Sequence, residues 1–80
     1  MDKIIFWNKI NDFFSSAKNG ELWLYGSTLA WEEDDEVLQF DFSKYLSIKD
    51  LWKILDELMQ DGLIEVVDTN NMSHIIVKIN

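Results

Sequence analysis

The clearest structural signal in this 80-residue sequence is LSIKDLWKILDELMQDGLIEVV, residues 46–67. Its apolar residues recur every three or four positions, which predicts an amphipathic helix over residues 47–61. Ser47 is a good N-cap residue, and the acidic residue three positions later makes a variant of the capping box. Gly62 is suited to end the helix, and Leu63 then lies where a Schellman cap makes an apolar contact with the last turn.

A β-hairpin is expected to close the chain. Residues 64–67 and 75–79 are rich in isoleucine and valine, and turn-forming asparagines lie between them. Ile75, Val77 and Ile79 fall on one face of the last strand because side chains alternate along a strand.

The first third of the chain predicts a helix followed by a short strand. Apolar residues at helical spacing place the helix over about residues 3–17, and Asn19-Gly20 is a typical C-terminal stop. The apolar and aromatic residues 22–25 predict a strand. Trp7 on this helix and Trp52 on the later one are expected in the core.

Residues 28–42 allow two interpretations. Leu38, Phe40 and Phe42 alternate with polar residues, which predicts a half-buried strand paired with residues 28–31 in a hairpin. The competing interpretation is a short acidic helix over residues 30–39, because glutamate, alanine and leucine are good helix formers. We favour the hairpin.

The whole chain, residues 1–80, is therefore expected to be one small α+β domain, with two amphipathic helices packed on a small, mostly antiparallel sheet in the order helix, strand or strands, helix, β-hairpin. A helix over residues 30–39 would instead give a layout that resembles winged-helix domains. That resemblance is topological. Residues 47–61 carry two lysines against four acids, unlike a helix that reads DNA.

Composition narrows the function classes. The chain is 48% apolar and 14% aromatic, with no cysteine, proline or arginine, and its pI is about 4.3. The missing arginine and the acidity argue against direct nucleic-acid binding, and no apolar run approaches the ~20 residues that span a membrane. The Met start and final strand suggest a complete small protein. The lack of cysteine and of an export signal suggests the cytoplasm.

The negative charge is concentrated in one segment. Between Lys18 and Lys44 there are seven acids and no base. Those acids are Glu21, Glu32, Glu33, Asp34, Asp35, Glu36 and Asp41. The segment is either a solvated loop that keeps the protein soluble or a contact surface for a basic partner, with Trp31 as an apolar anchor beside the charges. A metal site is the weakest interpretation, because the glycine turn of a calcium loop is missing.

No residue pattern indicates catalysis. His74 is the only histidine and lies in no metal-binding or nucleophile motif. The three glycines are isolated, so no glycine-rich phosphate loop is present. We therefore expect no enzyme activity, no metal and no cofactor.

These observations predict a non-enzymatic, acidic protein-binding module. The expected role is inhibition of a basic partner by occlusion, as in an immunity protein, an antitoxin or a phage-type nucleic-acid mimic, with a nuclease or nucleic-acid-binding protein as the partner. The binding residues would be Trp31, Glu32, Glu33, Asp34, Asp35, Glu36 and Asp41. The alternative is a winged-helix-like scaffold or regulator that acts through apolar contacts or homodimerisation. Ile4, Ile5 and Ile54 lie off the main helical stripes and are its candidate contacts.

Overall fold

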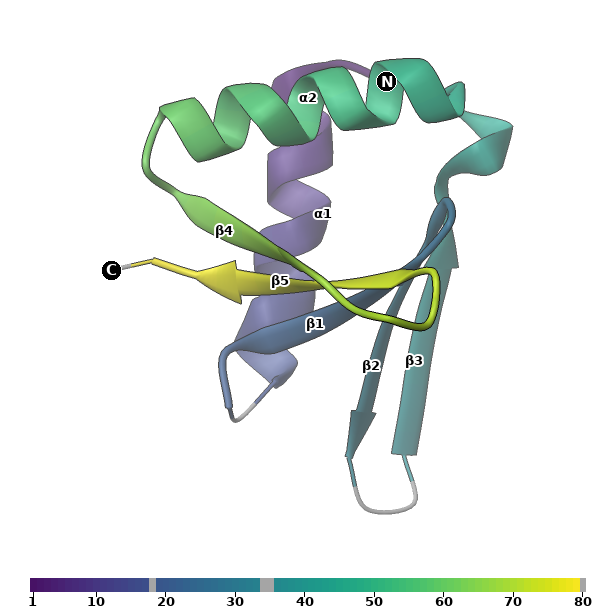
Figure 1. The fold of residues 1–80 in the computed structure, drawn as a ribbon, viewed down its shortest axis with the longest axis vertical. Coiled ribbons are helices and arrows are strands. Elements are labelled where there is room, and N and C mark those ends of the chain that lie inside the picture. Colours follow the sequence, from purple (N-terminus) through teal and green to yellow (C-terminus); the bar gives the residue numbers. More distant parts are fainter. Residues whose placement is uncertain (18, 34–35, 80) are drawn as a thin grey trace.

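A computed structural model describes residues 1–17, 19–33 and 36–79 as an α+β domain (Figure 1). The elements in order are α1 (Lys3–Ser16), β1 (Glu21–Tyr25), β2 (Thr28–Glu33), β3 (Glu36–Asp41), the 3-10 turn η1 (Phe42–Lys44), α2 (Ile48–Gln60), β4 (Ile64–Asp68) and β5 (Ser73–Lys78). The α+β class, the two helices and the C-terminal hairpin are confirmed.

The five strands form one antiparallel sheet in the order β3-β2-β1-β5-β4. The hairpin predicted within residues 28–42 is confirmed, and the helix over 30–39 is wrong for the described residues. With it the winged-helix-like layout is ruled out. The alternating pattern prevails because Leu29 faces Phe40 and Trp31 faces Leu38 across the β2–β3 ladder, so the apolar residues share one side.

α1 begins at the N-cap Asp2, whose Oδ1 accepts a hydrogen bond from the Ile5 N–H at 2.9 Å. It ends one residue earlier than predicted, with Ala17 as the C-cap. Gly20 takes a φ of 69° in the turn that follows, a left-handed conformation that glycine adopts without strain.

The predicted caps of α2 are confirmed. Ser47 Oγ accepts a hydrogen bond from the Asp50 N–H at 3.1 Å. At the other end Gly62 has a φ of 75°, and its N–H donates to the Met59 carbonyl at 3.0 Å. The Leu63 N–H donates to the Leu58 carbonyl at 3.1 Å, which completes a Schellman motif. These bonds set where α2 stops and where β4 begins.

Ser47→Ala should lower the free energy of unfolding by about 1 kcal/mol, because the Asp50 N–H loses its capping acceptor. Urea titration followed by circular dichroism measures the change. Ser27→Ala is the control, because Ser27 bonds through its backbone carbonyl, which accepts a hydrogen bond from the Phe42 N–H at 2.9 Å. Equal losses in the two variants would show that the Ser47 cap contributes nothing specific.

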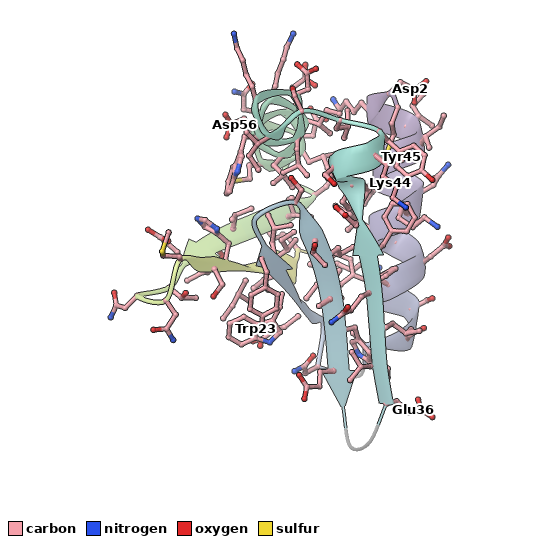
Figure 2. The ribbon with its side chains drawn as sticks, turned by 90° about the vertical axis from the view of Figure 1, so that its right-hand side faces the viewer. Asp2, Trp23, Glu36, Lys44, Tyr45 and Asp56 are labelled. Carbon is pink, nitrogen blue, oxygen red and sulfur yellow. The ribbon has the colours of Figure 1, made fainter. Side chains whose placement is uncertain are left out.

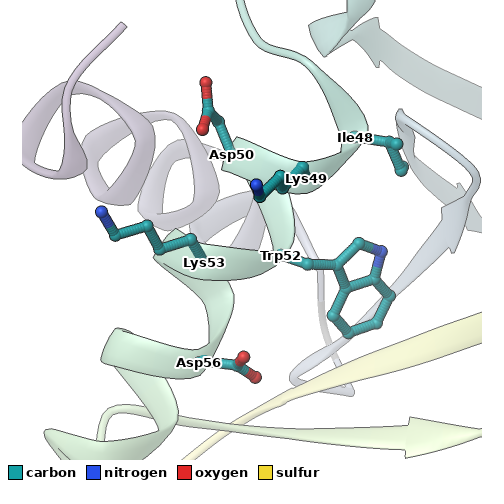
Figure 3. Close-up of a pocket in the computed structure, with 6 residues that line it drawn as sticks. All are labelled: Ile48, Lys49, Asp50, Trp52, Lys53 and Asp56. Carbon is teal, nitrogen blue, oxygen red and sulfur yellow. The ribbon is translucent and has the colours of Figure 1, made fainter.

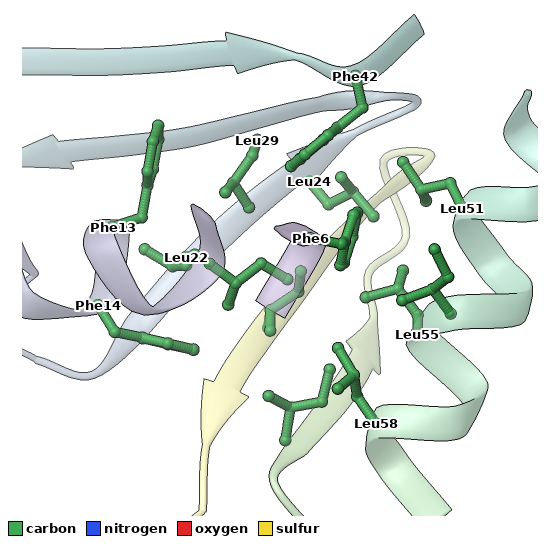
Figure 4. Close-up of a cluster of buried hydrophobic side chains, with 14 of the residues drawn as sticks. Phe6, Phe13, Phe14, Leu22, Leu24, Leu29, Phe42, Leu51, Leu55 and Leu58 are labelled. Carbon is green, nitrogen blue, oxygen red and sulfur yellow. The ribbon is translucent and has the colours of Figure 1, made fainter. Parts of the chain in front are cut away.

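The core lies between the helices and one face of the sheet (Figure 4). α1 runs behind the sheet, and α2 crosses one end of it (Figure 1). The most deeply buried side chains are Phe6, Ile10, Leu22, Leu24, Leu29, Phe42, Leu51, Leu55, Leu58, Ile64 and Ile76. Trp7 and Trp52 pack against this cluster but remain partly exposed, so their predicted burial is only partial.

Candidate protein-binding surface

The two faces of the sheet have different surroundings. Leu24 faces Leu29 on the side covered by the helices, whereas Trp23 faces Ala30 on β2 and Ile75 on β5 on the other side. Figure 2 shows Trp23 on the side of the sheet away from α1. In the part of the chain that the structure describes, neither helix covers this second side, which we call the open face.

The open face carries a group of apolar side chains. The Trp23 and Tyr25 rings stack with centroids 6.0 Å apart and planes 10° apart. Tyr25 is 51% exposed, and Val37 and Val67 are 53% and 42% exposed. Ile75 and Val77, on the same side of β5, are half-buried. Exposed apolar side chains gathered on one side of a sheet are typical of an interaction surface.

Charge is distributed unevenly over the molecule. By strand register, the open face carries the exposed acids Glu21, Glu32, Asp41 and Glu65. Five lysines lie in helical elements: Lys3, Lys9, Lys44, Lys49 and Lys53. Lys78 faces Ile64, which places it on the helix-covered side of the register. Among the described residues the open face therefore has acids and no base.

The hairpin of β2 and β3 forms an acidic arm, residues 28–41. Figure 1 shows it extending away from α2, and Glu36 lies at the distant end of β3 (Figure 2). Glu32 and Glu36 are exposed, and Glu33 lies directly opposite Glu36 in the ladder. The candidate residues Asp34 and Asp35 lie outside the described residues.

Trp31 does not serve as an exposed anchor. It is only 7% exposed and belongs to the core cluster, because β2 is flanked by strands on both sides and its apolar face lies against the core. The exposed apolar side chains near the acids are instead Val37 and Leu38 on β3. Sequence reasoning missed them because only the strand order shows that β3 is an edge strand.

Asp41, another candidate, also has a structural role. Its Oδ1 accepts a hydrogen bond from the Ser43 N–H at 2.9 Å and caps η1. The hydrogen bonds from Ser43, with a smaller contribution from the Lys44 charge, hold the pKa of Asp41 below its ordinary value. Asp41 therefore contributes a negative charge to the arm and also caps the turn that leads to α2.

Asp41→Asn should reduce the pH dependence of the free energy of unfolding at acidic pH. The lowered pKa means that ionised Asp41 stabilises the fold above its ordinary pKa of about 3.9, and that this stability is lost as the pH falls through the lower folded-state pKa. Asparagine can still accept the Ser43 hydrogen bond but carries no charge. Urea unfolding at a series of pH values should give the wild type a larger free energy of unfolding than Asp41→Asn at neutral pH. This difference should become smaller as the pH falls. A gap independent of pH would contradict this assignment.

The helices carry balanced charge. Lys3 Nζ lies 2.7 Å from Asp61 Oδ2, joining the start of α1 to the C-cap of α2, and this hydrogen bond raises the pKa of Lys3. Lys9 Nζ lies 4.5 Å from the centroid of the Phe40 ring. Lys3 is therefore paired with a helix cap, and Lys9 lies on the helix-covered side of the sheet, where Phe40 faces Leu29.

A depression of about 590 Å³ lies along α2 (Figure 3). Its lining residues are Ile48, Lys49, Asp50, Trp52, Lys53 and Asp56. The mixture of lysines and aspartates gives it no single charge preference. Nearby, the His74 ring packs edge-on against the Trp52 ring, with their centroids 4.7 Å apart. Nε2 of His74 lies 3.3 Å from Asp68 Oδ1. Within residues 1–17, 19–33 and 36–79, no three potential metal ligands come together.

Comparisons of the chain with protein-family models, with curated proteins and with solved structures found no match. None of the helices that the structure describes is long and apolar enough to span a bilayer. What the protein does is therefore inferred from its own surface.

Proposed function

We propose that this protein is a non-enzymatic, acidic protein-binding module that inhibits a basic partner by covering its functional surface. The observation that supports this most is the uneven distribution of charge, with acids and no described base on the open face and a near balance of lysines and acids on the helices. A surface of one sign steers an oppositely charged partner and fixes the side on which the complex forms.

The chemistry of the acids suggests the class of partner. A basic cleft that binds nucleic acid holds lysines and arginines positioned for phosphates. Carboxylates on a projecting arm, such as Glu32 and Glu36, would compete for those same groups. The partner is therefore a nuclease or another nucleic-acid-binding protein, and the role is that of an immunity protein, antitoxin or phage-type inhibitor acting in the cytoplasm.

Capture from the host lysate tests this role. The full chain is immobilised through its N-terminus, and bound proteins are identified by mass spectrometry at low and high salt. Salt near 1 M reduces the Debye length to about 3 Å, so an acid-driven complex should be lost. A captured basic protein whose nucleic-acid activity falls in proportion to added chain is the expected result. A partner that stays bound at high salt and keeps its activity would contradict the proposal.

A second role, assembly through apolar contacts, is favoured by one observation. Ile4 and Ile5 on α1 are 71% and 53% exposed. Ile54, predicted as a third contact, is buried in the core, and a surface role for it was wrong. Sedimentation at low and high salt separates the two roles, because a scaffold would form a salt-insensitive dimer and the inhibitor would remain monomeric.

A further inference from the structure

We propose that the open face binds an amphipathic helix of the partner, with the apolar stripe of that helix lying across the strands and its lysines or arginines beside the acids. The inference rests on the proposed function in one respect, namely that the partner is basic. It adds a second contact surface, distinct from the tip of the acidic arm, and a shape for the segment that binds there.

The apolar part of the open face forms a row across four strands. Val67 on β4 faces Ile75 on β5, Ile75 faces Trp23 on β1, and Trp23 faces Ala30 on β2. Neighbouring strands are about 4.8 Å apart, so this row is about 14 Å long. A helix rises 1.5 Å per residue, so about three turns would cover the row.

The row and its neighbour Tyr25, two residues from Trp23 on the same face, contain the side-chain types that contribute most at interfaces. Tryptophan and tyrosine are enriched among the residues that dominate binding energy. Trp23 and Tyr25 hold each other in place by stacking at 6.0 Å, so little side-chain freedom is lost when a partner covers them. Both faces of the sheet carry apolar side chains. Among the described residues, the helices of this chain pack only against the face opposite the open face.

The flanking charges identify the occupant. Glu65, Glu21 and Glu32 each lie two residues along the strand from a member of the apolar row, on the same face. They form an acidic border on one side of the row. A second copy of this chain would bring another acidic face against them, and like charges oppose that pairing. A helix with basic residues beside its apolar stripe complements both the row and its border.

A designed peptide tests the inference. The probe is an 18-residue capped helix with leucines on one stripe and lysines elsewhere, and the control peptide has the same composition in scrambled order. Backbone and indole resonances of the 15N-labelled full chain are followed during titration at moderate salt. The expected shifts are at Trp23, Ile75 and Val77, with the scrambled peptide binding about tenfold more weakly, because it presents no apolar stripe.

Matched charge reversals locate the site. Glu65→Lys alters the border of the open face, whereas Asp56→Lys makes the same charge change on α2, and both side chains are exposed. Glu65→Lys should lower the affinity for the helical peptide about tenfold, and Asp56→Lys should lower it by less than about threefold. Tyr25→Ala, at a half-exposed side chain, removes apolar contact without a charge change and should also weaken binding.

The other outcomes overturn the inference. Equal weakening by the two reversals, or equal binding of the scrambled peptide, would indicate general attraction to an acidic protein. Shifts confined to the arm or the helices would place the contact elsewhere, and self-association that buries Trp23 would make a second copy the occupant. If a captured partner depends on the arm acids but not on Glu65 or Tyr25, the inference fails while the proposed function stands.

Discussion

Replacing Phe42 with alanine is expected to lower the free energy of unfolding by about 3–5 kcal/mol, the range for large-to-small changes at fully buried aromatic sites. Phe42 is fully buried where η1 joins the acidic arm to α2. Its ring lies 4.6 Å from that of Phe6 on α1 and 4.9 Å from that of Phe40 on β3. The cavity left by alanine would therefore weaken three elements at once.

The loss is large for a chain of this size. A domain of 80 residues is stable by about 4–12 kcal/mol, so Phe42→Ala should leave a measurable unfolded population at 37 °C. Phe40→Ala is the control, because Phe40 is only partly buried and should cost about 1–2 kcal/mol. Urea unfolding followed by tryptophan fluorescence measures both variants. Similar losses would show that the junction at Phe42 is not the centre of the packing.

The second large effect is expected in binding. Glu33→Gln, Asp34→Asn and Asp35→Asn together remove three charges from the acidic run of the sequence. Because electrostatic steering changes association rates by about 10–10³-fold, this triple variant should associate with the captured partner at least about tenfold more slowly at low salt. The variant should remain folded, since each amide side chain has nearly the size and shape of the carboxylate that it replaces. Stopped-flow mixing at several salt concentrations measures the rate.

The control keeps the same net charge. Asp12→Asn, Asp56→Asn and Glu57→Gln remove three charges from the helices instead of the arm. If the arm is the contact, this second triple variant should associate with nearly the wild-type rate. Equal slowing in the two variants would assign the effect to the net charge of the protein and not to the arm.

The elements with local signals could be predicted from the sequence. The start and end of α2 depend on Ser47 and Gly62, which act through hydrogen bonds and a backbone conformation within a few residues. The β2–β3 hairpin follows from alternation, because Leu38 and Phe40 repeat with the period of a strand. The segment does not form a helix despite its helix-forming residues, because strand pairing and side-chain burial outweigh intrinsic helix propensity.

The features that depend on strand order could not be predicted. On β5, Ile75 and Val77 share one face and Ile76 the other, and all three are apolar, so periodicity alone does not say which face meets the helices. In the structure Ile76 is fully buried in the core, and the other two side chains lie on the open face. The same holds for Trp31, which lies next to the acids in sequence but is directed into the core.

Competition with nucleic acid distinguishes occlusion of the partner's functional surface from binding at another surface. The captured partner is loaded with a fluorescently labelled oligonucleotide, and the full chain is added while anisotropy is recorded. Full displacement at one chain per partner, lost on arm neutralisation and retained in the Asp12, Asp56 and Glu57 control, is the predicted result. A ternary complex, in which the chain binds and the oligonucleotide stays bound, would contradict it.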